Sequence, residues 1–90
     1  MSKWNYFQVM NIDSYGFLDH KVDFGFNAQA ISFLNRGSHT LEYSFNGVDL
    51  HGDLVPGDPS AGLFFDSRTE SVAFFRAADG YSVIRIEAWR

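Results

Sequence analysis

The residues best suited to chemistry are two aspartates and a histidine that alternate, Asp49, His51 and Asp53. Alternate residues of a β-strand point to the same face, so a strand here would align the three side chains in a row. Carboxylate and imidazole groups bind metal ions, but such a site needs further ligands from other segments. Outward polar faces are common on strands, and we therefore interpret the row as a solvated face rather than a metal site.

The other chemically competent side chains form no recognisable set. The three histidines, His20, His39 and His51, stand far apart in or beside turns, which favours a surface role over a three-histidine zinc site. The absence of cysteine excludes disulfides and thiolate metal sites. The sequence also lacks the serine-hydrolase elbow, the phosphate-binding loop and the dinucleotide glycine pattern. We therefore expect a protein that is not an enzyme and holds no cofactor.

Composition narrows the class of partner. The net charge is −4, and the seven Lys and Arg residues are scattered, whereas a nucleic-acid binder normally carries a basic patch. No segment approaches the roughly 18 apolar residues of a membrane span, and the start lacks the apolar run of a signal peptide. We expect a chain made in the cytoplasm, with neither nucleic acid nor a membrane as its partner.

Ninety residues make a single domain, residues 1–90, with a thin hydrophobic core. Aromatic residues account for 18% of the chain, a high fraction for this size. Such content fits a β-rich core. It also fits a protein that buries some of its aromatic side chains against a neighbour.

Alternating patterns predict the strands. Residues 40–46 place Leu41, Tyr43 and Phe45 on one face, and the following Asn46-Gly47 predicts a type I′ turn into a return strand over residues 48–55. A second hairpin is predicted from residues 70–76, an Asp-Gly turn, and residues 82–89.

The last strand has a clear two-sided pattern. We expect Ile84, Ile86 and Ala88 to face the core. Arg85 and Glu87 share the other face, where they pair with each other or with the neighbouring strand.

Further strands are predicted at residues 20–27, at residues 28–35 and, as a short buried strand, within residues 62–68. Residues 1–12 form either a strand or an extended arm that lies on a neighbouring subunit. The best helix candidate, residues 13–20, is broken by glycine. Seven or eight short strands at this spacing predict an all-β fold, a small antiparallel β-sandwich or barrel.

Several aromatic residues are candidates for contact with a partner. Phe74 and Phe75 are adjacent, so one ring faces outward, either toward a partner or beneath the N-terminal segment. The candidate interaction residues are Trp4, Tyr6, Phe7, Phe75 and Trp89.

The run "ISFLNRGSHTLEYSFNGVDLHGDLVPG", followed by "GLFFDSR", "SVAFFR" and "GYSVIRIEAW", resembles small accessory virion proteins of tailed bacteriophages. The resemblance spans residues 31–89. It implies a structural protein of the virion that decorates the capsid or joins head and tail components. Its implied partners are capsid or tail subunits, contacted by a homo-oligomer or a symmetric array.

A small glycan-binding β-sandwich is the alternative. Exposed aromatic rings would then form a stacking platform, with Trp4, Tyr15, Tyr81 or Trp89 as candidates. The two hypotheses differ in the arrangement of the exposed aromatic residues: a concave cluster favours a glycan, and a flat stripe favours another protein.

Overall fold

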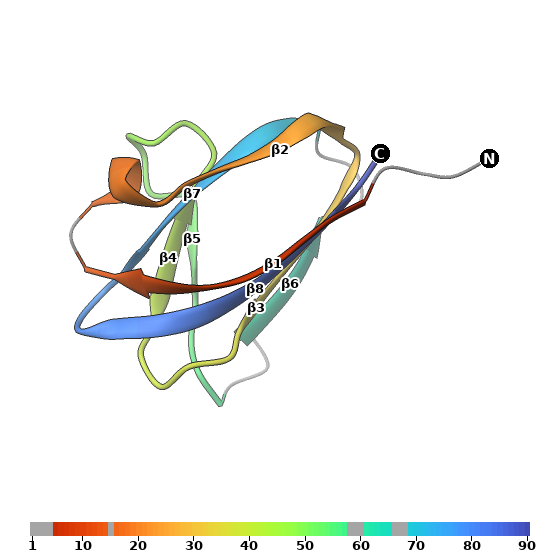
Figure 1. The fold of residues 1–90 in the computed structure, drawn as a ribbon. Helices are drawn as coiled ribbons and strands as arrows, with labels where there is room; N and C mark the ends of the chain where they lie inside the picture. Colours follow the sequence, from red (N-terminus) through yellow and green to blue (C-terminus); the bar gives the residue numbers. More distant parts are fainter. Residues whose placement is uncertain (1–4, 15, 58–60, 66–68) are drawn as a thin grey trace.

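The computed structural model describes residues 5–14, 16–57, 61–65 and 69–90 (Figure 1). Among these residues, no helix has the length and apolar character needed to cross a bilayer. The elements in chain order are β1 (Asn5–Asp13), the 3-10 helix η1 (Phe17–His20), β2 (Lys21–Ala28), β3 (Ala30–Asn35), β4 (Leu41–Ser44), β5 (Gly52–Leu54), β6 (Gly62–Phe65), β7 (Glu70–Ala77) and β8 (Tyr81–Trp89).

The strands form two antiparallel sheets. Sheet A has the order β1-β8-β3-β6, and sheet B has the order β2-β7-β4-β5. The two sheets lie face to face as layers (Figure 1), and the predicted β-sandwich is confirmed. β8 shows the alternation expected of it: Ile84, Ile86 and Ala88 are buried, while the residues between them are partly exposed.

The core lies between the sheets and is rich in aromatic rings. Phe33, on β3, is fully buried, and its ring contacts those of Tyr43, Phe45, Phe65 and Phe75 with centroids 4.9–6.0 Å apart. Tilted and edge-to-face pairs of this kind stabilise a core beyond the area that they bury. One cluster of rings therefore joins both sheets.

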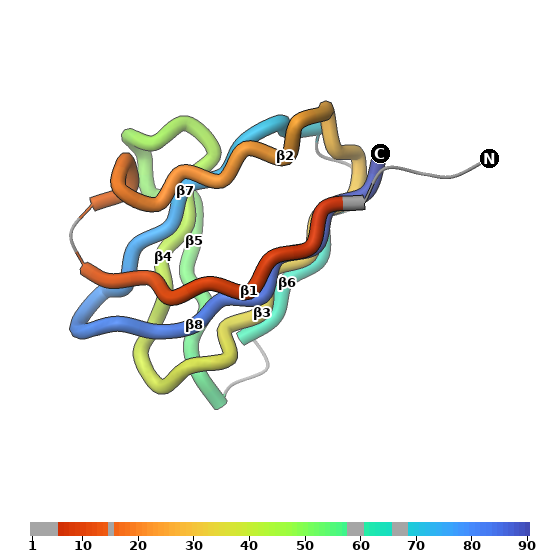
Figure 2. Tube along the Cα trace, in the orientation of Figure 1, coloured from red at the N-terminus to blue at the C-terminus, as the bar shows by residue number. Residues whose placement is uncertain are grey.

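The predicted C-terminal hairpin is wrong, because β7 and β8 belong to different sheets. The chain crosses from one layer to the other through residues 78–80, where the tube turns at the left edge of Figure 2. Gly80 has a positive φ of 64°, but Asp79 does not, and a type I′ turn needs positive φ at both positions. Each of the two strands instead has two neighbours within its own sheet.

The tight turn predicted at Asn46-Gly47 is also wrong, and β5 is much shorter than the return strand expected there. The Asn46 side chain accepts hydrogen bonds from the backbone N–H groups of Val48 and Asp49, at 2.8 Å each. Ser44 Oγ accepts from the N–H groups of Asn46 and Gly47. These side chains satisfy the backbone locally and favour a wider loop over residues 45–51.

Residues 5–12 belong to strand β1, which pairs with β8 over nine residues, so of the two alternatives, strand or extended arm, the strand holds. Two further segments are also settled by the structure. β6 is an edge strand with Phe64 60% exposed, not a buried strand. Between β1 and β2, the segment that formed the best helix candidate contains only the four residues of η1.

Candidate functional site

The alternating polar row does not form. Asp49 and His51 lie in the loop before β5, and only Asp53 is in a strand. Asp49 Oδ2 accepts a hydrogen bond from the Asn46 amide at 2.8 Å, and His51 Nδ1 accepts one from the Phe45 N–H at 3.0 Å. No group of three potential metal ligands occurs within the described ranges. These side chains hold the loop in shape.

The other two histidines also have local partners. His20 Nε2 lies 2.7 Å from Asp13 Oδ1, which ties the end of β1 to the end of η1. The His39 ring stacks against Tyr81 with centroids 6.3 Å apart. Both interactions join neighbouring segments of the fold.

The aromatic residues predicted to contact a partner lie in different environments. Trp4 lies outside the described residues. Tyr6 points inward and meets the Phe24 ring edge-on at 5.4 Å. Phe75 is fully buried in the core, so the prediction that it contacts a partner is wrong. Phe7 and Trp89 lie on the outer face of sheet A.

The Phe74-Phe75 pair keeps the alternation of a regular strand. Phe75 faces the core and Phe74 faces outward, but only 7% of Phe74 is exposed. A side chain at Gly47 would touch both Phe74 and Leu18, so the loop lies over Phe74 and beside the exposed Leu18. The chain therefore covers this ring itself, with η1 and the loop over residues 45–51, which lie side by side in Figures 1 and 2.

The outer face of sheet A carries several exposed or partly exposed apolar side chains around a charged pair, and we call it the aromatic face. Cross-strand register places its residues in rows, with Phe7 beside Glu87 and Val9 beside Arg85 on β1 and β8. The aromatic face consists of Phe7, Val9, Leu34, Phe64 and Trp89, with Arg85 and Glu87 between them. Phe7 and Phe64 are 59% and 60% exposed, so large apolar rings face solvent.

Arg85 occupies the middle of the aromatic face. Its Nη2 lies 2.8 Å from Glu87 Oε1, and its guanidinium carbon is 5.3 Å from the centre of the Phe7 ring. Its Nε is buried and has no hydrogen-bond partner within the part of the chain that the structure describes. A buried donor without an acceptor is costly, so this arrangement of Arg85 carries an energetic penalty.

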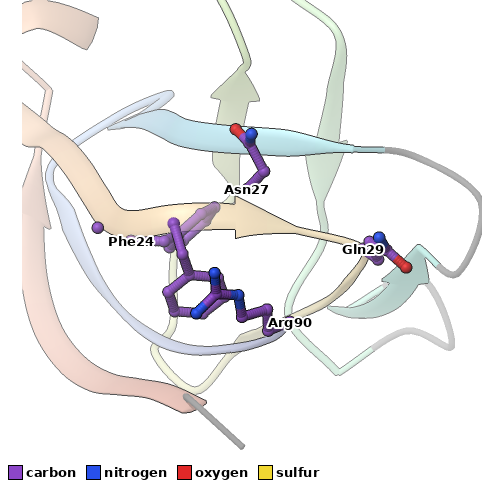
Figure 3. Close-up of a pocket in the computed structure, with 6 residues that line it drawn as sticks. Phe24, Asn27, Gln29 and Arg90 are labelled. Carbon is purple, nitrogen blue, oxygen red and sulfur yellow. The ribbon is translucent and has the colours of Figure 1, made fainter.

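A second feature is a hollow of about 540 Å³ beside β2, lined by Phe24, Gly25, Phe26, Asn27, Gln29 and Arg90 (Figure 3). The side chains of Asn27 and Gln29 point away from that of Arg90 (Figure 3). Small-molecule sites depend on polar groups that converge on the ligand. These groups diverge, and neither Tyr81 nor Trp89 lines the hollow.

A buried polar cluster around Asn35 was not predicted from the sequence. Its amide nitrogen donates to the carbonyl oxygens of His39 and Leu54, and its amide oxygen accepts from the Gly37 N–H and the Ser82 hydroxyl. All four hydrogen bonds of the amide are made, as a buried amide requires. The cluster joins β3, β5 and β8 and is a structural feature.

Comparison with known proteins adds no family. No protein-family model and no curated protein matches the chain. A solved structure of the Drosophila NLP core, described in connection with pentamer formation and histone binding, matches with a TM-score of 0.44. The match has 12% identity and covers 92% of this chain and 95% of that one. At this score it carries no inference about function.

Proposed function

We propose that the chain is a non-enzymatic structural protein that acts through protein–protein contacts, with the aromatic face as its contact surface. The observation that carries the proposal is the exposure of Phe7 and Phe64, with the partly exposed Trp89, on one outer sheet surface. Contiguous apolar patches on small soluble domains commonly mark interaction sites.

The composition of the aromatic face supports this proposal. Phe64 and Trp89 contact each other edge-on with centroids 6.1 Å apart, and Phe7 lies under Arg85. Aromatic residues and arginine are enriched at the centres of protein interfaces, where they contribute most of the binding energy. The best-matched partner is a flat surface with apolar side chains for the exposed rings.

We propose further that the partners are capsid or tail subunits of a tailed-bacteriophage virion, bound by a homo-oligomer or a symmetric array. This part depends on the resemblance of residues 31–89 to accessory virion proteins. A decorating or joining protein needs contact surfaces and no active site. The absence of a recognisable catalytic motif in the sequence is compatible with that role.

The glycan-binding alternative has weaker support. Tyr81 and Trp89 begin and end β8, so they are separated by about 26 Å at the usual rise of about 3.3 Å per strand residue. They cannot stack on one sugar unit together. Trp89 instead lies on a sheet surface with Phe64, an arrangement better suited to a protein partner.

Particle incorporation tests the proposed function. Phage particles would be grown from a genome that carries the chain with Phe64→Ser, with Leu50→Ser as the matched control, because Leu50 is exposed in the loop before β5. Mass spectrometry of purified particles measures the copies retained. We expect Phe64→Ser to reduce incorporation at least about tenfold and Leu50→Ser to leave it unchanged. Absence of the unsubstituted chain from particles contradicts the virion role, and equal incorporation of both variants contradicts the use of the aromatic face.

A further inference from the structure

A two-sheet sandwich has four edge strands, and three of them here carry features that discourage pairing with another chain. β5 has three residues and includes the exposed Asp53, and β6 has four residues. β2 carries the exposed Lys21 and Asp23, and its register shifts before Ala28, where Gly25 has a φ of 81°. Short length, charge and bulges all block edge-to-edge pairing.

β1 is the exception. It is a nine-residue edge strand that pairs with β8 at every position without a bulge. Its sequence, NYFQVMNID, contains no proline, glycine or lysine, and its one charged residue is Asp13 at the far end. A long, regular, uncharged edge leaves a row of backbone donors and acceptors ready to pair with another strand.

We infer that β1 pairs antiparallel with β1 of a second copy of this chain, joining two copies of sheet A into one continuous sheet. The inference goes beyond the proposed function, because it assigns the contact to the backbone edge of β1, beside which Phe7 and Val9 of the aromatic face lie. Most homodimers have a two-fold axis. Such an axis here brings β1 of one copy against β1 of the other.

The register follows from length and side-chain direction. Pairing centred on Val9 places Val9 opposite Val9 of the second copy and Phe7 opposite Asn11, while the Asp13 N–H at the strand end keeps its hydrogen bond to His20. Residues of the same parity then face the same way in both copies, so Phe7 and Val9 of each copy extend a shared outer surface. A shift by one residue would break this continuity.

The charge distribution selects a second copy as the occupant. In the register centred on Val9 each Asp13 lies opposite Asn5, and the two Asp13 residues are at opposite ends of the pair. No like charges meet across the axis, and like charges directly opposite each other destabilise a pair of strands. Val9, 42% exposed, and Phe7, 59% exposed, both lose exposed apolar surface beside the new strand.

The experiment measures association by light scattering after size exclusion across a range of concentrations. We expect the unsubstituted chain to dimerise and Val9→Lys to raise the dimer Kd at least about tenfold, because two lysines then meet at the axis. Val48→Lys is the matched control, since Val48 is 79% exposed in the loop before β5. An equimolar mixture of Val9→Lys and Val9→Glu should recover the dimer through opposite charges.

A cross-linking variant tests the register directly. The chain contains no cysteine, so Val9→Cys adds a single thiol that meets its counterpart across the axis. We expect a disulfide-linked dimer under mild oxidation for Val9→Cys and none for Val48→Cys at the same concentration. Circular dichroism confirms that each variant is folded.

Two results would overturn the inference. One is a monomer at every concentration. The other is a dimer that Val9→Lys and Val48→Lys affect equally. In that case Phe64→Ser shows which surface is used. If Phe64→Ser abolishes a dimer that both lysine variants leave intact, the copies associate through the aromatic face. The edge-pairing inference then fails, while the proposed use of the aromatic face stands.

Discussion

The two sheets differ in whether the chain covers the aromatic side chains that point outward from them. On sheet B, the outward Phe74 is covered by η1 and the loop over residues 45–51. The nearby Arg76 lies 4.1 Å from the centre of the Phe17 ring and pairs with Glu42 at 2.6 Å. On sheet A, the aromatic face has no comparable cover within the described residues, and Phe7 and Phe64 remain more than half exposed.

The difference indicates which of the two outer faces is the contact surface. Sheet B covers its outward ring with the chain's own residues, although Leu18 and Val48 of that cover are themselves exposed. Sheet A leaves aromatic rings in water, and burying them against another protein is favourable. The contrast between the two faces, and not the mere presence of exposed aromatic residues, is what singles out sheet A.

The test with the largest expected effect compares the same substitution, Phe to Ala, on the two faces. Phe74→Ala removes a ring that is buried under η1, and we expect it to lower the free energy of unfolding by about 3 kcal/mol. Phe64→Ala removes an exposed ring, and we expect a loss below about 1 kcal/mol. Urea denaturation measures both values, and similar losses would mean that the two faces are equally covered.

Sequence alternation predicted which residues of β8 face the core, because every second position from Ser82 to Ala88 is buried. It also indicated that one ring of the Phe74-Phe75 pair faces outward, but the wrong one was assigned to a partner. The cover over Phe74 comes from a short 3-10 helix and an irregular loop, which have no periodic pattern. That part of the fold could not be read from spacing.

The second test adds a side chain at Gly47, in the loop that covers Phe74 on sheet B. Gly47 has a φ of 78°, and a Cβ there would lie 3.1 Å from both Leu18 and Phe74. Gly57 has a similar φ of 71°, but no atom of the described residues lies within 4 Å of such a Cβ, so it is the matched control.

We expect Gly57→Ala to cost about 1 kcal/mol from backbone strain alone, and Gly47→Ala about 2 kcal/mol, because Leu18 and Phe74 must also shift. Thermal unfolding of the two variants measures the difference. If they prove equally stable, the loop does not press on Phe74 and its role as a cover is wrong.

The pairing of strands was harder to predict than their existence. Both Asn46-Gly47 and Asp79-Gly80 carry hairpin sequences, yet in each pair only the glycine has a positive φ. Local turn signals do not say which sheet a following strand joins, because that depends on distant partners such as β1 and β3. For the same reason Phe7 and Trp89 were identified as candidate contact residues from sequence, whereas Phe64 was assigned to a buried strand and missed.

A smaller effect concerns the two sides of β1. Burial, and then the negative charge of Asp23, raise the pKa of Tyr6 above its ordinary value of 10.0, while its neighbour Phe7 faces solvent. A raised pKa favours the neutral phenol in the folded state. The resulting stability is fully present below pH 10 and is lost as the pH rises from 10 through the raised pKa.

Tyr6→Phe should therefore flatten the decline in stability above about pH 10, whereas Tyr81→Phe, at an exposed site, should keep the decline of the unsubstituted chain. Urea midpoints measured between pH 7 and pH 11 follow both variants. An unchanged slope in Tyr6→Phe would place this phenol in water and β1 further from the core.

The test with the smallest expected effect asks whether the loop that covers sheet B is held by the chain alone or needs a bound cation. The loop over residues 45–51 is held by hydrogen bonds from Ser44, Asn46 and His51, and Asp49 is bonded to Asn46 within it. A structural cation in so small a domain would contribute several kcal/mol. We expect EDTA to change the melting temperature by less than about 2 °C, an amount below 1 kcal/mol for this size. A larger drop, reversed by adding a divalent cation and absent in Asp49→Asn, would mean that the loop needs an external ligand. Sheet B would then depend on an outside partner as sheet A does, and the contrast between the faces would no longer distinguish a contact surface.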